Sequence, residues 1–379
     1  MESVRGADLN NKRVLVRVDY NVPIKNGVVG DLNRIKKSLP TLNFLLEHKV
    51  KIVLITHLGK PKGEIDTEFS TVPLARELSN LLGRKVMATD HLVDDRAYEI
   101  AGGMEFGDIL MLGNLRWNPG EEENDEKYAE ALAKFGDIYV NDAFGVSHRA
   151  HASVSKITEF LPSYSGFLLD NEIETLTLIL KNPVRPFVLI MGGAKIKDKS
   201  GLIENLSDKV DKILVGGAIA NTFAAANGEE VSESLTEPEM YEASKQMREK
   251  LGEKLVLPID SVRDDIGDGK FKIMDIGPES LLQFGREIER AKTVFWNGNM
   301  GYSEDERFVV GTRGIAEALS KLEGTKVVAG GDTAGFVNDN GYADKMSFVS
   351  TGGGAALEFL AGEPMPGVEA LNKSMKNIN

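Results

Sequence analysis

The chain has 379 residues, which is too long for one typical hydrophobic core and favours two domains. Its formal net charge of −13, with no long basic run to offset it, argues against nucleic-acid binding. The absence of cysteine excludes disulfides and thiolate chemistry, and no apolar run approaches the ~20 residues of a membrane span.

Short β-rich runs alternate with helical patterns along almost the whole chain. In the first half, the sequence predicts strands at 13–18, 50–56, 85–88, 108–112 and 137–140, and helices at 34–48, 72–82 and 125–135. Pro40 interrupts the first helical pattern, which predicts a kink or a late first turn there. A second series of strands is predicted at 187–191, 212–215, 254–257, 293–296, 326–329 and 346–349, each followed by a turn and a helical pattern.

This alternation implies parallel sheets that are covered by helices on both faces. Because there are two such series, we expect an α/β fold with two doubly wound, Rossmann-like lobes at 1–166 and 183–360. Residues 167–182 lack clusters of glycine, proline or serine, so they read as a helix that joins the lobes. A stiff connector suits two lobes that face an open cleft and move about defined hinges.

The stretch at 350–358, Ser-Thr-Gly-Gly-Gly-Ala-Ala-Leu-Glu, follows an apolar run with strand character. Gly352, Gly353 and Gly354 leave the backbone bare just before a helix-forming segment. Free N–H groups and the helix dipole favour an anion at such a place, so the stretch predicts a phosphate site. A glycine-rich turn with a serine or threonine cap is the alternative.

Polar residues follow the ends of several predicted strands in the first half, where ligands bind in open α/β sheets. They are Arg34, His57, Lys60, Arg116, His148 and Arg149, and the first predicted strand ends the same way, with Asp19 and Asn21. Any one of them alone reads more simply as a solvated surface residue. Together they predict a basic cleft for an anionic ligand in an otherwise acidic protein.

The second half offers glycine-rich turns after its strands. Since 14 of the 39 glycines lie in residues 1–180, the C-terminal lobe is the richer in glycine and is the expected nucleotide side. In Gly-Gly-Ala-Lys-Ile-Lys-Asp-Lys at 192–199, the i and i+4 spacing of Lys195 and Lys199 predicts two ammonium groups on one helical face. The alternative for these lysines is an exposed basic helix start.

A carboxylate follows the strand predicted at 326–329, in the sequence Gly330-Gly331-Asp332-Thr333. A hard oxygen beside free N–H groups suits Mg²⁺ carried by nucleotide phosphates, with an ordinary helix N-cap as the competing role for Asp332. Neither GxxxxGK[ST] nor GxGxxG occurs, which counts against a P-loop enzyme and a standard Rossmann dehydrogenase. With no Ser-His-Asp order, HExxH or paired catalytic glutamates, the expected chemistry is phosphate positioning.

Seven motifs, in order over essentially the whole chain, resemble those of phosphoglycerate kinase. They are VDYNVP (18–23), HLGKPKG (57–63), NDAFGVSHRAH (141–151), GGAKIKDK (192–199), FWNGNMG (295–301), GGDT (330–333) and STGGGAALE (350–358). The resemblance implies two Rossmann-like lobes, a C-terminal segment at 361–379 that returns to the first lobe, and a monomer. It also implies reversible transfer of the acyl phosphate of 1,3-bisphosphoglycerate to MgADP, giving 3-phosphoglycerate and ATP, by direct in-line transfer after hinge closure.

The same resemblance implies roles for individual residues. The glycerate substrate would be held by Asp19, Asn21, Arg34, His57, Lys60, Arg116 and Arg149, and Arg34 would stabilise the phosphoryl group in flight. The phosphoryl group and the nucleotide phosphates would be held by Lys195 and Lys199, and the moving charge would meet the N–H groups of Gly352, Gly353 and Gly354. The nucleotide would contact Gly217, Gly277, Glu304, Gly330, Gly331 and Thr333, with Asp332 at the Mg²⁺. Phosphoryl transfer needs such placement and charge neutralisation more than covalent catalysis.

Six positions depart from the usual family residues. Lys60 stands where Arg is usual, which loses a planar fork but keeps the charge. The others are Gly113 for Glu, Asn118 for His, Asn299 for Pro, Ala329 for Gly and Phe348 for His. None removes a group assigned to charge stabilisation, so the reaction type stands while substrate affinity and the nucleotide loop are affected.

Two rival readings of the chain remain. One is a catalytically impaired nucleotide-binding protein of the same fold, which the departures at 60, 113, 118, 329 and 348 favour. The other is a two-lobed dehydrogenase, which fits the alternation but lacks the dinucleotide fingerprint. The first 11 residues have no signal-peptide core, so for every reading we expect a cytoplasmic protein without nucleic-acid or membrane partners.

Overall fold

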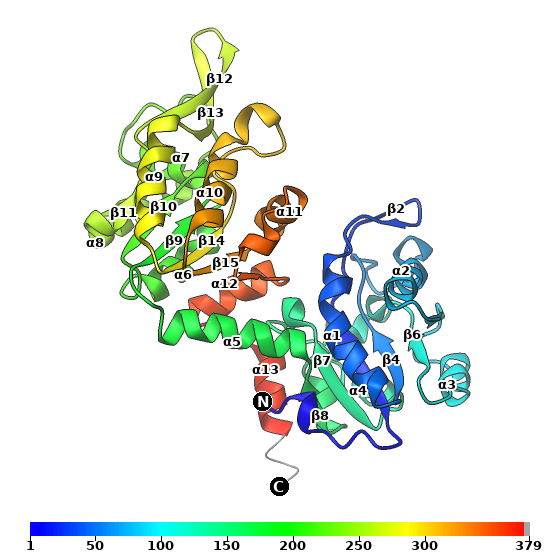
Figure 1. Ribbon diagram of the computed structural model, residues 1–379. Coiled ribbons are helices and arrows are strands. Elements are labelled where there is room, and N and C mark those ends of the chain that lie inside the picture. Colours follow the sequence, from blue (N-terminus) through cyan, green and yellow to red (C-terminus); the bar gives the residue numbers. More distant parts are fainter. Residues whose placement is uncertain (375–379) are drawn as a thin grey trace. The chain divides into compact units, whose positions relative to one another are not determined.

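The computed structural model describes residues 1–374, which form two compact units (Figure 1). Unit 1 contains Met1–Glu174 and the segment that begins at Pro364, and unit 2 contains Thr175–Glu363. The boundary falls within helix α5 (Phe167–Lys181), which lies where a connecting helix is predicted. Near the C-terminus, α13 (Pro366–Ser374) packs against strand β8 (Ser163–Ser165) of unit 1.

Unit 1 is built on a parallel six-stranded sheet in the order β5-β6-β4-β1-β7-β8. The central strand β1 (Arg13–Val18) pairs with β4 (Lys51–Ile55) and β7 (Ile138–Asp142), so that Val16 lies opposite both Leu54 and Val140. The remaining elements are β5 (Met87–Ala88), β6 (Ile109–Met111), the small hairpin β2 (Ile24–Lys25) and β3 (Val28–Val29), and the helices α1 (Asn33–Glu47), α2 (Val72–Leu82), α3 (Asp95–Gly102) and α4 (Glu126–Ala133).

Both faces of this sheet are buried, as expected for a parallel sheet whose strands are apolar on both sides. On one face, Val14 and Val16 of β1 join the same core as Leu42 of α1. The alternate positions of β1, which point to the opposite face, are Leu15 and Arg17, and both are fully buried. Strand β1 therefore carries a charged side chain into the interior of unit 1.

Unit 2 is built on a second parallel six-stranded sheet, in the order β11-β10-β9-β14-β15-β16. The strand order reverses between β9 (Phe187–Met191) and β14 (Thr293–Asn297), and such a switch point opens a crevice at the carboxyl ends of the strands. The other strands are β10 (Lys212–Val215), β11 (Leu255–Val256), β15 (Thr325–Ala329) and β16 (Phe348–Val349). The prediction of two doubly wound parallel sheets is confirmed.

The helices of unit 2 also cover both faces of their sheet. Ile190 of β9 and Trp296 of β14 lie in one core with Phe284 of α9, whereas the alternate residues Leu189 and Phe295 are buried on the opposite face. The helices are α6 (Ser200–Leu206), α7 (Gly217–Ala226), α8 (Tyr241–Leu251), α9 (Pro278–Arg290), α10 (Val310–Lys321), α11 (Gly331–Asp339) and α12 (Gly353–Ala361).

Several elements differ from those predicted. In unit 1, the hairpin of β2 and β3, helix α3 and the edge strand β8 were not predicted. The strand predicted at 254–257 is followed by an antiparallel hairpin, β12 (Ser261–Gly267) and β13 (Lys270–Ile276), before the next helix. The sequence analysis did not predict this hairpin, because its sequence is charged and most residues of its strands are exposed or only partly buried. The hairpin extends beyond the rest of unit 2 in Figure 1. Pro40 lies inside α1 rather than in a late first turn, because the helix already begins at Asn33.

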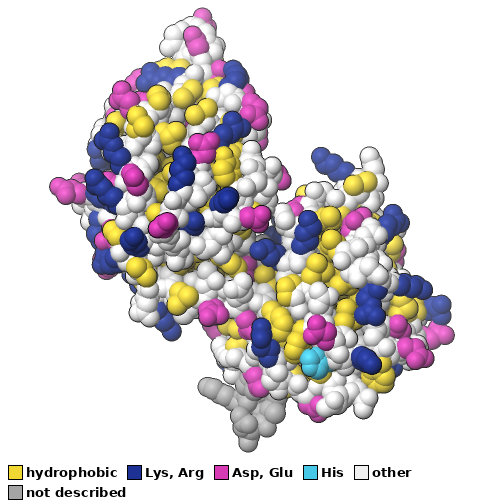
Figure 2. Space-filling view, viewed as in Figure 1, with side chains coloured by type: hydrophobic (Ala, Val, Ile, Leu, Met, Phe, Trp, Pro, Cys, Tyr) yellow, Lys and Arg dark blue, Asp and Glu magenta, His cyan; other side chains and the backbone are white. Residues whose placement is uncertain are grey.

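Charged side chains of both signs are interspersed on the face of each unit shown in Figure 2. Within residues 1–374, no helix combines the length and the apolar character needed to cross a membrane.

Candidate functional site

Unit 2 contains a pocket of about 1450 Å³ along the carboxyl ends of its strands. Eight of the predicted nucleotide-site residues line it, namely Lys195, Lys199, Gly217, Glu304, Gly330, Gly331, Asp332 and Thr333. They come from the turns after β9, β10, β14 and β15, because parallel strands bring these turns to one edge of the sheet. Gly277 does not line the pocket; it lies at the N-cap of α9 beside Ile276, which does.

Lys199 lies at the switch point of this sheet. Its Nζ donates hydrogen bonds to the carbonyl oxygen of Gly192, just after β9, and to that of Asn297 at the end of β14, the latter at 3.4 Å. The side chain is buried, and this burial lowers the pKa of Lys199 to about 8, against the opposing charges of Asp198 and Asp332. A cation is therefore held under the pocket by carbonyl dipoles rather than by a paired carboxylate.

The prediction that Lys195 and Lys199 share one helical face is wrong. Residues 192–196 form no helix, Lys197–Lys199 is a single 3₁₀ turn, and α6 begins only at Ser200. After β9 the chain bends, with Gly193 at a φ of 88°, before the first helical turn begins. Both lysines nevertheless line the pocket, Lys195 from the turn after β9 and Lys199 from the 3₁₀ turn that follows it.

Two helix N-termini meet beside this pocket. Helix α11 begins at Gly331 and α12 at Gly353. A Cβ atom on Gly353 would lie 2.8 Å from Cα of Gly330, so only glycine lets the two backbone turns approach this closely. The N–H groups and dipoles of the two helix starts create positive potential without a charged side chain, and the N–H of Gly352 donates to Ser350 Oγ at 3.2 Å. The predicted helix start at Gly352–Gly354 is confirmed.

Asp332 and Thr333 occupy the first turn of α11. Thr333 Oγ1 accepts a hydrogen bond of 2.8 Å from the N–H of Gly298, which ties the turn after β14 to this helix. Asp332 is exposed in the pocket, and Gly330 rather than Asp332 takes the N-cap position. The alternative role of Asp332 as an N-cap is therefore wrong, which leaves its carboxylate available to a ligand-borne cation.

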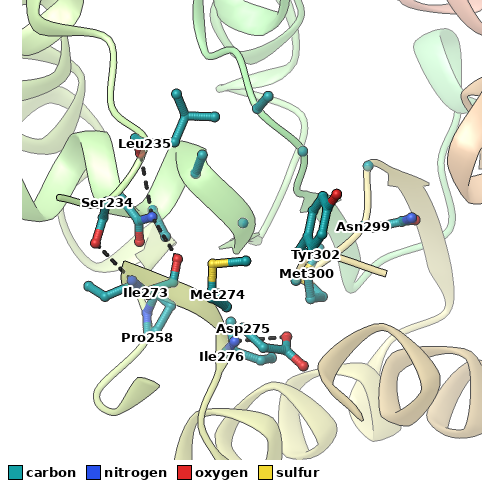
Figure 3. Close-up of a pocket in the computed structure, with 18 of the residues that line it drawn as sticks. Ser234, Leu235, Pro258, Ile273, Met274, Asp275, Ile276, Asn299, Met300 and Tyr302 are labelled. Atoms are coloured by element: carbon teal, nitrogen blue, oxygen red, sulfur yellow. Dashed lines mark hydrogen bonds between the residues drawn. The ribbon is translucent and has the colours of Figure 1, made fainter. Parts of the chain in front are cut away.

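Apolar side chains line part of the pocket beside polar ones, and Figure 3 shows part of this wall. Leu235, Ile259 and Tyr302 line it although each leaves half or more of its surface exposed. Exposed apolar side chains inside a pocket are typical of contacts that await a flat, poorly hydrated ligand group. This part of the pocket is thus suited to a nucleobase, while the glycine turns and Lys199 are suited to phosphates.

Asp275, at the end of β13, was missed by the sequence reasoning. Its buried carboxylate accepts hydrogen bonds of 2.8 Å from the N–H groups of Ile276 and Gly311, the second residue of α10. Burial raises the pKa of Asp275 to about 6. It supports the turn that carries Glu304: a Cβ on Gly301 would lie 2.4 Å from the Asp275 carboxylate, and the N–H of Tyr302 donates to the carbonyl of Met274 at 2.8 Å. Figure 3 shows Asp275 with its bond to Ile276.

In unit 1, the predicted substrate residues are linked by contacts at the carboxyl edge of the sheet. Arg34, in the first turn of α1, forms an ion pair with Asp19, which follows β1. Asp19 accepts from the N–H of Asn21 at 3.3 Å, and the Asn21 side chain accepts from Gly59 N–H at 2.9 Å. The carbonyl of Gly59 in turn accepts from the Arg116 guanidinium at 2.8 Å.

His57 is buried at the end of β4 and contacts Arg17 rather than solvent. Arg17 Nη2 lies 3.1 Å from His57 Nδ1. Burial first, and then the charges of Arg17, Arg116, Arg34 and Arg149, lower the pKa of His57 well below its usual range. His57 is therefore neutral at physiological pH. A guanidinium can only donate, so Nδ1 of His57 must accept the bond from Arg17. The ring proton of the neutral His57 is therefore on Nε2.

The remaining predicted residues of unit 1 lie on its surface. Arg149 is exposed, and its Nε donates to His148 Nε2 at 3.1 Å. Burial and the adjacent Arg149 lower the pKa of His148 to about 4. Lys60 is exposed one residue beyond Gly59. The positive charge of this edge therefore comes from arginine and lysine, while the histidines are neutral.

Two of the departures from the family pattern have local roles. Asn118 accepts a hydrogen bond of 2.9 Å from Gly120 N–H and so caps the 3₁₀ turn Pro119–Glu121. Asn299 donates to Ser303 Oγ at 2.5 Å within the turn that carries Glu304. Both departures thus stabilise turns instead of removing a charged group from a site.

The comparisons with known proteins point to one family. The phosphoglycerate kinase family model matches residues 4–363. The phosphoglycerate kinase of Pseudothermotoga lettingae is 43% identical over 99% of each chain, and that of a Roseiflexus species is 44% identical over 98% of this chain and 99% of the relative.

Solved structures agree with this assignment. The phosphoglycerate kinase of Coxiella burnetii has a TM-score of 0.85 at 38% identity and 98% coverage of both chains. That of Pyrococcus horikoshii has a TM-score of 0.90 at 29% identity, covering 99% of this chain and 100% of the other. The chain therefore belongs to the phosphoglycerate kinase family, and its reaction is the reversible transfer of a phosphoryl group between 1,3-bisphosphoglycerate and ADP.

Proposed function

We propose that the two units divide this reaction, so that unit 1 binds 3-phosphoglycerate or 1,3-bisphosphoglycerate and unit 2 binds MgADP or MgATP. The observation that carries the proposal is the continuous series of contacts from Arg34 through Asp19, Asn21 and Gly59 to Arg116. It holds two guanidinium groups at one edge, where a small anion with a carboxylate and a phosphate needs two separate cationic contacts.

In unit 1, Arg34 contributes most to catalysis. Phosphoryl transfer passes through a loose transition state with charge on three equatorial oxygens, which a planar guanidinium stabilises by several N–H donors. The ion pair with Asp19 fixes the direction of the Arg34 side chain before substrate arrives. Asn21, His57, Lys60, Arg116 and Arg149 complete the glycerate site that we propose.

In unit 2, the phosphates bind over Lys195, Lys199 and the N–H groups of Gly352, Gly353 and Gly354, with Gly330, Gly331 and Thr333 alongside. Gly217 and Gly277 are assigned to the base and ribose end, and Glu304 to the ribose hydroxyls. These assignments are supported by the glycine contacts at the start of α12 and by Lys199 at the switch point. Such preorganised dipoles stabilise charge without reorganising during the reaction.

Mg²⁺ enters with the nucleotide as part of the substrate. Among the residues that the structure describes, no group of three or more His, Cys, Asp or Glu could hold a metal ion by itself. The exposed carboxylate of Asp332 fits an ion that takes one protein oxygen and several phosphate oxygens. When bound with the nucleotide, Mg²⁺ would neutralise phosphate charge, and Asp332 would hold it.

Direct in-line transfer requires the two bound substrates to meet, so we propose that substrate binding triggers a hinge closure that excludes water. Small-angle X-ray scattering with and without both substrates measures it as a fall in the radius of gyration. We also propose that this glycolytic enzyme is a cytoplasmic monomer that binds no nucleic acid. Sedimentation tests the monomer, cell fractionation the location, and a DNA-binding titration the absence of nucleic-acid binding.

The reaction itself is measured with 3-phosphoglycerate and MgATP, coupled to NADH oxidation through glyceraldehyde-3-phosphate dehydrogenase, with each component omitted in turn. Turnover that needs every component is the expected result. Nucleotide binding by calorimetry without turnover would instead support the catalytically impaired alternative. Tight NADH binding would support the dehydrogenase reading.

The division between the units is tested with Arg149→Ala, because Arg149 is exposed and its loss should not unfold the protein. We expect about a tenfold higher KM for 3-phosphoglycerate, the value of one charge-assisted hydrogen bond, with an unchanged KM for ATP. Arg96→Ala is the matched control, since Arg96 is an exposed arginine of α3. Equal changes in both KM values would contradict the assignment.

A further inference from the structure

Beneath the proposed glycerate site, unit 1 buries a polar cluster formed by Arg17, His57, Glu121 and Ser153. Arg17, Glu121 and Ser153 are fully buried, and His57 is 3% exposed. They come from four separate segments: strand β1, the turn after β4, the 3₁₀ turn Pro119–Glu121 and the loop before residues 156–159. Burying charged groups costs several kcal/mol each unless they are paired, so such a cluster needs a reason.

The hydrogen bonds of the cluster have a defined direction. Arg17 Nε lies 2.9 Å from Ser153 Oγ, which in turn lies 2.6 Å from Glu121 Oε1. A guanidinium can only donate, so Ser153 Oγ accepts from Arg17 and its single proton is left for Glu121. Glu121 Oε2 also accepts from the N–H of Ser153 at 3.0 Å, which aligns the hydroxyl between the two charges.

The opposite end of the same guanidinium reaches His57. Arg17 Nη1 donates to the carbonyl of Val18, and Nη2 lies 3.1 Å from His57 Nδ1. The bonds at Nε and Nη1 leave the planar fork no freedom to rotate, so Nη2 is fixed on the imidazole. The tautomer of His57 is thereby set to Nε2–H, with the donor on the ring atom that Arg17 does not contact.

Glu121 balances the buried charge of Arg17 without touching it. Burial raises the pKa of the Glu121 carboxyl, and Arg17 and the two bonds from Ser153 lower it. Glu121 is expected to be ionised, because a neutral Glu121 would leave the buried charge of Arg17 without a compensating anion. Ser153 links the two groups. His151 Nδ1 lies 3.8 Å from Glu121 Oε1, and burial and nearby arginines lower the pKa of His151 to about 3, so His151 supplies no compensating charge.

We propose that Glu121 and Ser153 are positioning residues for phosphoryl transfer: through Arg17 they hold His57 as a neutral Nε2–H donor for the glycerate substrate. This inference rests on the proposed role of His57 in unit 1. A fixed neutral donor recognises an anionic oxygen without adding a further charge to the cluster of arginines. It also removes the cost of choosing a tautomer each time substrate binds.

The tautomer is measured first, by long-range ¹H–¹⁵N NMR of the imidazole groups in the ligand-free protein at pH 7. The chain has five histidines, and the His57 signals are assigned with His57→Gln. The proposal expects one neutral Nε2–H species for His57. An Nδ1–H tautomer or an imidazolium would overturn it, whatever the kinetics show.

The coupling is then measured with Glu121→Gln and Ser153→Ala. We expect mixed His57 tautomers in both and about a tenfold rise in KM for 3-phosphoglycerate, with KM for ATP and kcat within about twofold. Ser153→Thr keeps the hydroxyl and should restore both the tautomer and KM. Glu123→Gln, an exposed neighbour, and Ser155→Ala on the same loop are the matched controls.

The two readouts separate this inference from the proposed function. Unchanged His57 signals in both variants would overturn the coupling even if KM rose, because the rise would then reflect a displaced loop. A changed His57 tautomer with an unchanged KM for 3-phosphoglycerate would show that Glu121 and Ser153 set the tautomer through Arg17. It would overturn both the positioning role and the assignment of His57 to the substrate site. Equal changes in both KM values would indicate a purely structural cluster.

Discussion

Both proposed sites bind anions, but unit 1 uses charged side chains and unit 2 uses mainly backbone groups. In unit 1 the cationic groups are side chains, aligned by neighbouring side chains as Arg34 is by Asp19 and Arg17 by Ser153. In unit 2 the positive potential comes largely from backbone, at the glycine turns where α11 and α12 begin. A side-chain site loses a function when a group is removed, whereas a backbone site loses it when a group is added.

Removing a side chain from unit 1 gives the largest expected effect. Arg34→Ala should lower kcat by about 100-fold to 1000-fold, the usual cost of losing one donor aimed at transition-state charge. Its stability should fall as well, because Arg34 is partly exposed but its removal leaves the buried Asp19 carboxylate without its ion-pair partner. Turnover is measured with the coupled assay, and the fold by circular dichroism.

Arg76→Ala, an exposed arginine on α2, is the control and should behave as the wild type. Arg34→Lys keeps the charge but not the fork, so it should recover only part of kcat. Full turnover by a folded Arg34→Ala protein would show that this side chain does not stabilise the phosphoryl group.

Adding one methyl group to unit 2 gives the next largest effect. Gly298 has φ of 93°, and a Cβ there would lie 2.2 Å from the Gly192 carbonyl oxygen and 2.6 Å from Lys199 Nζ. Gly298→Ala should therefore raise KM for ATP by tens of fold and lower the free energy of unfolding by about 1–3 kcal/mol. KM for 3-phosphoglycerate should stay unchanged.

The matched control is Gly285→Ala in α9, where a Cβ meets no atom within 4 Å. It should leave the kinetics unchanged and raise the free energy of unfolding by about 0.4–1 kcal/mol, because alanine is the better helix former. If both variants had the same kinetics, close backbone approach would not be a requirement of the nucleotide site.

The smallest expected effect is a pH dependence of ATP affinity that unit 1 does not share. Because burial lowers the pKa of Lys199 to about 8, its ammonium is increasingly deprotonated above pH 8 and cannot attract phosphate. The affinity for ATP should therefore be constant from pH 6.5 to 7.5 and then fall, by up to about tenfold per pH unit above pH 8. The affinity for 3-phosphoglycerate should not follow this profile.

Calorimetry of ATP binding in buffers of different ionisation enthalpy checks the origin of this effect. At pH 8.5 the wild type should take up protons as ATP binds, since phosphates favour the charged form of Lys199. Lys199→Met should bind more weakly and take up none of them. The same proton uptake in both proteins would assign the titration to another group.

Sequence reasoning found residues whose signal is local. The glycines at 352–354 follow a strand and precede a helix, and the structure starts α12 at Gly353 as expected. The Gly-Gly-Ala-Lys stretch at 192–195 carries the same local signal, but the predicted helical face for Lys195 and Lys199 was wrong. Spacing of i and i+4 has meaning only inside a helix, and α6 begins after both lysines.

Other residues were missed because their partners are distant in sequence. Arg17 lies 136 residues from Ser153, and Asp275 lies 36 residues from Gly311. One signal for Arg17 was present: a charged residue within the apolar strand Arg-Val-Leu-Val-Arg-Val, in a sheet expected to be covered on both faces. Such a residue must have a buried polar partner, although the sequence does not say which one.

By itself, the sequence determined most of the strands and helices and the polar residues at the strand ends, because these depend on side-chain periodicity and backbone preferences over a few residues. Only the tertiary structure decided which of those ends meet. The strand order places the turns after β9 and β14 on either side of Lys199, and it brings Glu121 and Ser153 beneath His57 through Arg17. Those contacts depend on how the sheets close and pack, which no short stretch of the chain encodes.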